Sequence, residues 1–408
     1  MRYSDLSEAI TGFPLDRVVV FDTETTGKDP YGGDEVLSIA ICDAYGNILF
    51  SSLVRPTRHS SWPDAQQVNG ISPRDVRDAP TIGQITPEIR DHLLGNKLVV
   101  GYNVSFDIQM LHSAGVFEEW PGATFDVMRE FATVHGTRRA PYGDPGYAWS
   151  SLTDCARQYG YRFNAHDGRE DAKATAYCYR ALLCDEKYLP GRIDAVLSRI
   201  RRVGVGQTKA TTSNVEALVD SGMTSSIKAE LRLGTTTRGA NAGSPRYECF
   251  VGDRCVGVQG SGQLDDIRAL YSLSDDDPLP KSIPCKALLS MTGKAARCSV
   301  KITARGKLRE DMMGAARNDR LVLGIPDNRA KIATIATVAK TSGPVEAGNV
   351  PHDRQIPTHS KDALQKAPRK KTGLAFKIAA VFLALLGLSG MLGRNTGEAY
   401  LAPILIGA

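Results

Sequence analysis

The feature that most constrains this chain is a strand-like run ending in two acids, VVVFDTETTG, with Asp22 and Glu24 near its end. The β-branched valines and the phenylalanine predict a strand buried inside a sheet. Side chains two residues apart on a strand emerge on one face, so both carboxylates point the same way. Two carboxylates held that close repel each other unless a cation lies between them. The alternative, a solvated pair at a strand edge, is disfavoured by the apolar run before it.

Two further stretches carry polar residues that gain meaning from this pair. Asp107 lies near the start of a predicted helix in GYNVSFDIQML, and Asp171 lies in the first turn of another in HDGREDAKATAYC. His166 precedes Asp171 by five residues. Taken singly, an acid at a helix start is a favourable partner of the helix dipole, and an exposed loop histidine has no role. Taken together, they predict a metal site with His166 as a general base at neutral pH.

Four carboxylates and a histidine are the groups that a two-metal phosphodiesterase needs. All-oxygen ligation favours Mg²⁺ or Mn²⁺ over zinc. None of the eight cysteines lies in a CxxC pair. We therefore expect reduced, mostly buried thiols, and not a zinc knuckle or a disulfide framework. The resulting hypothesis has two ions about 3.5–4 Å apart, with His166 accepting a proton from the attacking water.

Residues 14–190 alternate strand and helix signals, which predicts an α/β domain with a mixed central sheet. We expect strands over 16–23, 35–42, 47–54 and 97–101. We expect helices over 81–94, 104–113, 150–159 and 169–183.

Residues 16–187 resemble the DEDDh 3′→5′ exonucleases of the ribonuclease H-like fold, the group that includes the proofreading subunit of bacterial DNA polymerase III. The resemblance rests on FDTETTG, on GYNVSFDIQML, on the His166-x4-Asp171 spacing of the histidine branch, and on the similar segment VNGISPRDVRDAPTI. It covers a little under half of the chain.

This resemblance implies a five-stranded mixed sheet, His166 as the general base, and release of 5′-mononucleotides from the 3′ end of a nucleic acid. The choice between DNA and RNA stays open, with DNA favoured over RNA, and a homodimer or a polymerase or repair protein is the expected partner. The metal ligands that the resemblance implies are Asp22, Glu24, Asp107 and Asp171.

Side chains beside the acids are candidates for substrate binding. Tyr102, Phe106 and Trp149 could stack on terminal bases, with core packing as the alternative and the preferred one for Phe106. Thr23 and Thr25 flank Glu24 and could present backbone or hydroxyl groups to the terminal nucleotide.

Charge is unevenly divided along the chain. Residues 1–190 hold 18 Lys and Arg against 26 Asp and Glu, whereas residues 191–408 hold 32 against 19. An acidic first half suits a site that concentrates cations. A basic second half suits a polyanion, either nucleic acid or an anionic membrane surface. Basic clusters at 199–202 and 317–320 could bind phosphates or be solvated helix ends.

The sequence pattern changes after residue 190. Residues 203–243 predict a linker with one amphipathic helix, which begins at a capping box over 213–216. Residues 244–330 contain short strand-like runs and are consistent with a small β-rich domain of unknown function. Residues 339–373 are polar and basic and predict a disordered tether.

Residues 374–392 form an apolar run that predicts a C-terminal apolar helix. Its one charge, Lys377, is close enough to the end to snorkel, and a basic cluster at 366–371 precedes it. This pattern predicts a transmembrane span that anchors the soluble part to the cytoplasmic face of a membrane. The alternative is an apolar helix that packs on the protein or on a partner.

The leading hypothesis is therefore a metal-dependent 3′→5′ exonuclease that hydrolyses phosphodiester bonds. A second hypothesis is a catalytically silent nucleic-acid-binding or scaffolding protein that retains the fold; the intact acids argue against it. A third places the functional centre in residues 200–330, with the nuclease domain as an accessory, but that segment carries no chemical motif.

Overall fold

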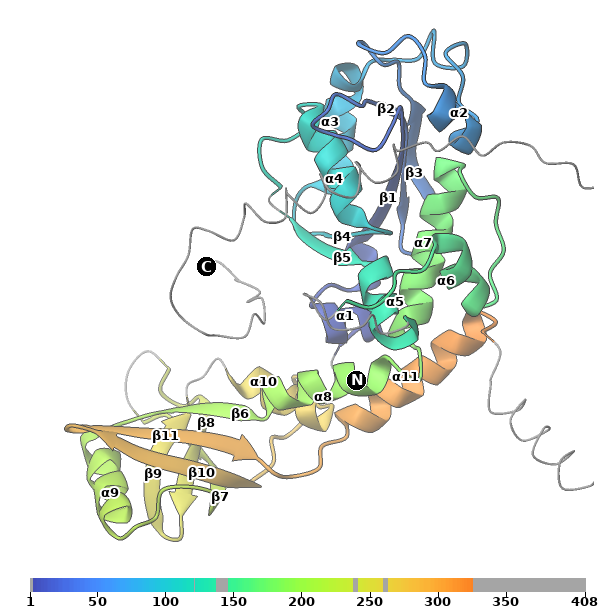
Figure 1. Cartoon of the computed structure of the whole chain (residues 1–408). Coiled ribbons are helices and arrows are strands. Elements are labelled where there is room, and N and C mark those ends of the chain that lie inside the picture. The colour runs from blue at the N-terminus through green and yellow to red at the C-terminus, as the bar shows by residue number, and fades with distance from the viewer. Residues whose placement is uncertain (1–2, 121, 137–145, 238–240, 260–262, 326–408) are drawn as a thin grey trace, which may run out of the picture. The chain divides into compact units, whose positions relative to one another are not determined.

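The computed structural model describes residues 3–120, 122–136, 146–237, 241–259 and 263–325 (Figure 1). The predicted tether at 339–373 and the predicted apolar helix at 374–392 lie outside these residues. Across the described ranges, no helix combines the length and the apolar character that a membrane crossing requires.

The first domain is built on a five-stranded mixed sheet in the order β3-β2-β1-β4-β5, which confirms the predicted sheet. β1 (Val18–Thr25) pairs antiparallel with β2 (Val36–Asp43), which pairs antiparallel with β3 (Ile48–Leu53). On the other side of β1, β4 (Leu98–Gly101) and β5 (Ala123–Asp126) run parallel to it. β1 is therefore the central strand.

Helices cover both faces of this sheet (Figure 1). One face carries α3 (Ile82–Leu93) and α4 (Val104–Ser113), and the other carries α7 (Gly168–Leu183). Three of the predicted helices are these, each within two residues of its predicted ends. The remaining elements of this domain and of the segment after it are α1 (Leu6–Thr11), η1 (Leu15–Arg17), α2 (Pro63–Asn69), α5 (Val127–His135), α6 (Leu152–Gln158) and α8 (Leu189–Ile200).

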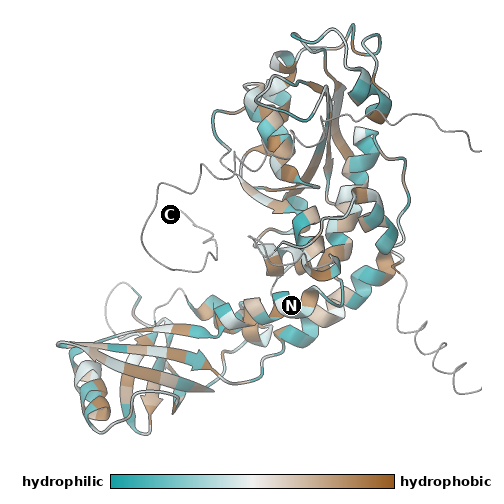
Figure 2. Ribbon diagram, viewed as in Figure 1, coloured by the Kyte–Doolittle hydropathy of each residue, from teal (hydrophilic) through white to brown (hydrophobic). Residues whose placement is uncertain are grey.

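Alternate residues of β1 enter two separate cores. Val18 and Val20 pack on the α7 side, whereas Val19 and Phe21 pack on the side of α3 and α4. Figure 2 shows hydrophobic residues along the central strands and hydrophilic residues on outward turns of the helices. Because Asp22 and Glu24 continue the Val18–Val20 alternation, both acids emerge on the face that α7 covers.

The second domain is a closed six-stranded barrel in the order β10-β11-β6-β9-β8-β7. Its helices are α9 (Lys209–Asp220), α10 (Leu264–Tyr271) and α11 (Leu308–Val322). Its strands are β6 (Arg202–Gly206), β7 (Ile227–Thr235), β8 (Pro245–Val251), β9 (Arg254–Gln259), β10 (Ser282–Thr292) and β11 (Ala295–Ile302).

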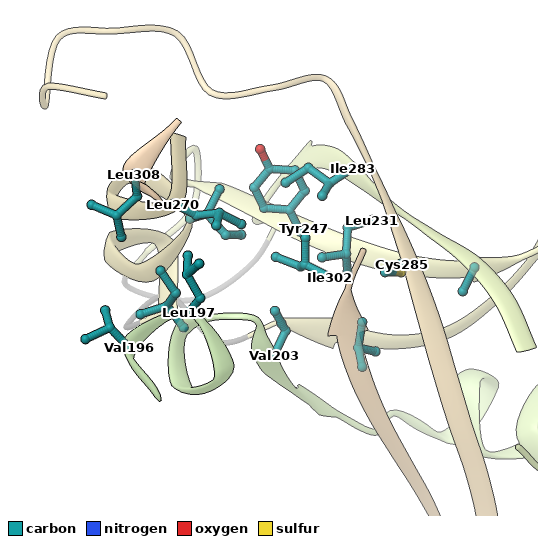
Figure 3. Close-up of a cluster of buried hydrophobic side chains, with 14 of the residues drawn as sticks. Val196, Leu197, Val203, Leu231, Tyr247, Leu270, Ile283, Cys285, Ile302 and Leu308 are labelled. Carbon is teal, nitrogen blue, oxygen red and sulfur yellow. The ribbon is translucent and has the colours of Figure 1, made fainter. Parts of the chain in front are cut away.

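The barrel core is filled by alternating inward residues of these strands. Along β10, Ile283, Cys285, Ala287 and Leu289 are buried and their neighbours are exposed, apart from Met291, which is half-buried. Figure 3 shows this cluster, in which barrel residues such as Tyr247 meet residues of α8, α10 and α11. The eight cysteines, all within described ranges, are free, and six of them are buried.

The predicted linker at 203–243 is wrong, because β6, α9 and β7 in this stretch are integral to the barrel. The predicted helix exists but begins five residues early, at Lys209, after a capping box formed by Thr208 and Thr211. The short, glycine-containing run RVGVG looks like a linker locally. It forms β6 only because β11 and β9 pair with it from distant parts of the chain.

Candidate active site

The end of β1 brings the first two predicted acids together with the start of α7. A methyl group placed on Gly168, the first residue of α7, would lie 3.7 Å from Oδ2 of Asp22. Asp171, one turn further along α7, is buried with 8% of its surface exposed. The first turn of α7 therefore lies within van der Waals contact distance of the acids of β1.

Asp107 reaches the same place from α4 and is held there by β1. The backbone N–H of Thr23 donates to Oδ1 of Asp107 at 3.0 Å, and the Thr23 hydroxyl donates to the same oxygen at 2.7 Å. Asp107 is 4% exposed, so these bonds form away from water. The residue between the two acids of the strand thus orients the third acid.

His166 lies on the approach to α7 and is tied to the fourth acid. Its backbone N–H donates to Oδ2 of Asp171 at 3.0 Å. Its φ of 69° lies in the left-handed region, which is uncommon for a residue other than glycine. Ligand atoms of Glu24, His166 and Asp171 all lie within 4.8 Å of one another. The structure therefore brings all five predicted residues into one site.

Burial and mutual repulsion raise the pKa of all four carboxyls. Burial is the largest cause for each. The charges of Asp107, Asp171 and Glu24 add to it for Asp22, whose pKa is raised well above its ordinary value. The pKa of Glu24 rises to about 7. That of Asp107 rises to about 7 despite the opposing hydrogen bonds from Thr23, and that of Asp171 rises to about 6.

This donor set fits divalent cations. Clustered carboxylates that cannot all be charged at neutral pH on their own become stable as anions when a cation is bound. Carboxylate oxygens are the ligands that Mg²⁺ and Mn²⁺ prefer. Asp22, Glu24, Asp107 and Asp171 would hold such ions.

Two cavities open at this site, of about 520 Å³ and about 590 Å³. They share Glu24, Val68, Asn69 and His166 among their lining residues. The first extends over β2 and β3 towards Arg169, and the second extends over the end of β1 towards Phe106. Both volumes fall in the range of small-molecule sites, so there is room for a nucleotide beside the acids.

The predicted substrate-contact residues do not all lie at these cavities. Thr23, Thr25 and Phe106 line the second cavity. Tyr102 lies elsewhere: its hydroxyl donates to the carbonyls of Ser150 and Ser151, at 2.8 Å and 3.0 Å. Contact of these side chains with substrate stays a prediction, and the placement of Tyr102 favours its structural role.

The residue patterns did not single out α2 as part of the site. Asn69 donates from Nδ2 to the carbonyl of Thr25 at 3.2 Å, and its side chain also bonds Glu24, which opposes the rise in the pKa of that acid. Val68, beside it, is 54% exposed and lines both cavities. Both residues lie in the segment VNGISPRDVRDAPTI. One sequence signal could have placed the end of α2 here: Gly70 follows Asn69, and a glycine in this position is typical of a helix end.

Known proteins resemble part of this chain. Residues 19–179 match the family model described as exonuclease. DNA polymerase III subunit epsilon of Escherichia coli K12 is 32% identical over 111 residues, which cover 25% of this chain and 43% of the relative. The Rickettsia felis protein of the same name is 30% identical over 100 residues, covering 24% of this chain and 43% of the relative.

A fungal relative matches over a longer stretch. RNA exonuclease 4 of Mycosarcoma maydis is 26% identical over 176 residues, which cover 40% of this chain and 41% of the relative. The chain thus spans less than half the length of each of these three relatives.

Proposed function

We propose that residues 19–179, which match the exonuclease family model, form a 3′→5′ exonuclease domain of the DEDDh type, and that the protein uses it to remove 5′-mononucleotides from the 3′ end of a nucleic acid with two Mg²⁺ or Mn²⁺ ions. The observation that carries this proposal is the convergence of four mutually repelling carboxylates and His166 beside two open cavities. A catalytically silent scaffold would have no need for four carboxylates whose burial and mutual repulsion destabilise the fold.

In the proposed mechanism, His166 is the general base. The residue is exposed, so its imidazole can be reached by an attacking water. Its backbone bond to Asp171 keeps the ring beside the acids. Divalent ions, when bound, would neutralise charge on the scissile phosphate and lower the pKa of water.

The remaining residues position these groups. Thr23 fixes the carboxylate of Asp107, and Asn69 holds the end of β1 through the carbonyl of Thr25. Phe106 and Val68 give the second cavity an apolar wall. An apolar wall beside a polar floor suits a terminal nucleotide, whose base is apolar on its faces and whose phosphate is charged.

We propose DNA as the substrate, on the strength of the two bacterial relatives named as DNA polymerase subunits. RNA is the competing substrate, since the fungal relative is named an RNA exonuclease. A polymerase or repair protein, or a second copy of this chain, is the proposed partner.

The test is a panel of 5′-labelled DNA and RNA strands, single and double, incubated with the full chain with and without Mg²⁺. Stepwise shortening from the 3′ end and release of 5′-mononucleotides only with the metal is the expected result. Asp22→Ala should abolish release, whereas Asp91→Ala, which removes an exposed acid on α3, should leave it unchanged. Release without metal, or release that survives Asp22→Ala, would overturn the proposal.

The membrane anchor at 374–392 stays a proposal from the sequence. Fractionation of cells that express the chain with and without residues 373–408 tests it. Recovery of the full chain with the membranes, and of the shortened chain without them, is the expected result. Equal distribution of the two forms would contradict it.

A further inference from the structure

Four cations form one row across the outer face of the barrel. In the strand pairing, Lys228 of β7 is directly opposite Lys286 of β10, which is directly opposite Lys301 of β11. Lys301 is in turn opposite Arg202 of β6. All four residues are exposed, and the inward neighbours of the lysines, such as Ala287 and Val300, are buried. We call these four residues the cation row.

The row carries three directly opposed pairs of like charge, an arrangement that destabilises a sheet. No ion pair among the described residues includes any of the four. The nearest acid along β7 is Glu230, which already bonds Arg232 and Ser282. The cation row is therefore a concentrated positive charge without a protein partner in the described structure.

A groove of about 690 Å³ runs along this face and is lined by three of the four cations, Arg202, Lys286 and Lys301. Ser225, Ser226 and Ser299 add hydroxyl groups to its lining. Leu288, two residues from Lys286 on the same face, is 52% exposed and also lines the groove. Positive charge, hydroxyl donors and one apolar side chain are what the phosphates and the sugar of a nucleic acid strand would contact.

We propose that the cation row binds the phosphodiester backbone of a nucleic acid strand, at a site separate from the carboxylate site. Adjacent strands of a sheet lie about 4.8 Å apart, so four cations span roughly 14 Å, which matches the axial rise of about four nucleotides of one strand. The choice of nucleic acid over other polyanions rests on the proposed exonuclease function. The binding itself requires no catalysis.

An anionic membrane is the alternative partner for a basic surface. The groove disfavours it, because a bilayer surface is broad and does not enter a groove, whereas a single strand does. Surface association also uses several apolar side chains, and Leu288 is the one large exposed hydrophobic residue among the groove's lining residues. The test therefore also measures binding of the protein to anionic vesicles.

The test uses the full chain in EDTA, which prevents cleavage, and measures fluorescence anisotropy with a labelled strand of roughly 30 nucleotides between about 50 and 200 mM salt. The key variant is Lys286→Gln with Lys301→Gln. We expect its affinity to fall on the order of tenfold and its log–log salt slope to be smaller by about 1.4–1.8, because each lost phosphate contact removes about 0.7–0.9.

Two matched variants complete the design. Lys281→Gln with Arg254→Gln removes the same charge from exposed barrel positions outside the row and should leave the salt slope close to that of the wild type. Lys286→Arg with Lys301→Arg keeps the charge and should retain binding. Circular dichroism melting confirms that each variant is folded.

The inference is overturned if the key variant keeps the wild-type slope, or if the control variant weakens binding equally. It is also overturned if vesicles of phosphatidylserine and phosphatidylcholine, and not strands, lose binding in the key variant. Failure of the proposed exonuclease function can be distinguished from failure of this inference. If the protein is not an exonuclease, no nucleotides are released, but these binding curves are unchanged. If both hold, the key variant should shorten long strands less processively and cleave dinucleotides at the wild-type rate.

Discussion

Thr23 donates both its backbone N–H and its hydroxyl to one oxygen of Asp107, at 3.0 Å and 2.7 Å. The residue that separates the two acids of β1 thus holds the third acid, which comes from α4. One strand segment thus positions three of the four carboxylates.

Replacing Thr23 tests this relationship. Thr23→Val removes the hydroxyl donor from a buried carboxylate, so we expect a loss of about 1–2 kcal/mol in the free energy of unfolding. We also expect severalfold weaker Mg²⁺ binding, because the pKa of Asp107 rises further. Thr23→Ser keeps the donor and is the control. Calorimetric titration with Mg²⁺ and urea unfolding measure both effects; equal behaviour of the two variants would contradict the assignment.

Neutralising one acid should separate stability from activity. In Asp22→Asn, the rate of nucleotide release should fall by roughly a thousandfold or more, because a metal ligand is lost. The metal-free variant should nevertheless be more stable than the wild type by about 1 kcal/mol, because the cost of burying this carboxylate and its repulsion with Glu24, Asp107 and Asp171 are both removed. Thermal melting in EDTA checks this. A less stable metal-free variant would show that the carboxylates do not repel one another as inferred.

His166→Asn should lower the turnover number by about 10²–10⁴, which is the usual contribution of a general base. Asparagine tolerates the left-handed backbone that His166 adopts, so this variant should keep its stability. His166→Ala should lose a further 1–2 kcal/mol or so of stability from backbone strain. Steady-state kinetics and Mg²⁺ titration provide the readout. A parallel loss of Mg²⁺ affinity in His166→Asn would identify His166 as a ligand instead.

Stability of the metal-free protein should fall as pH rises. The pKa values of Glu24 and Asp107 are raised to about 7 and that of Asp171 to about 6, so the folded state binds protons more tightly than the unfolded state. Their stabilising contribution is complete below their ordinary values near 4 and is lost as pH rises through about 6 to 7. Melting temperatures in EDTA should decline over this range, and Mg²⁺ should flatten the decline. An identical decline with and without Mg²⁺ would contradict cation binding by these acids.

Glu35, away from the site, should show the opposite dependence. Burial alone would raise its pKa, but donors from Thr57, His59 and Arg58 outweigh burial and lower the pKa to about 2. Its contribution is therefore present above its ordinary value of 4.5 and is lost as pH falls towards about 2. At pH 7, Glu35→Gln should cost about 2 kcal/mol.

The matched control is Glu88→Gln, which changes an exposed acid of α3 and should change stability by less than about 0.5 kcal/mol. The difference in the free energy of unfolding between the two variants should shrink as the pH of the buffer is lowered. A gap that stays constant with pH would exclude the charged form of Glu35 as its source.

The site was predictable from the sequence to the extent that its chemistry is local. Alternation along one strand placed Asp22 and Glu24 on a common face, and the spacing of His166 and Asp171 is fixed by one loop and one helix turn. The role of Asn69 was not predictable, since it depends on α2 folding back onto the end of β1, 44 residues earlier in the chain.

The fold, like the site, was predictable where it depends on local sequence and not where it depends on distant parts of the chain. α3, α4, α6 and α7 were each found within two residues of their predicted ends, and α3 and α7 have a clear local periodicity. β5 was missed because it has only four residues and no buried ones, so it carries no pattern of its own. The barrel closes through pairing of β10 with β7 and of β11 with β6, across long stretches of chain. A strand such as β6, with five residues and two glycines, is defined by its partners and not by its own propensity.

The left-handed backbone at His166 has a consequence for how this position can change over generations. Besides histidine, the residues that adopt such a conformation most readily are glycine, asparagine and aspartate; the first two carry no titratable side chain, and the carboxyl of aspartate ordinarily titrates near 4. Any single replacement therefore gives up either the fold of the loop or the base. A lineage that needs this site has no gradual route away from histidine here, and loss of activity at this position should be abrupt.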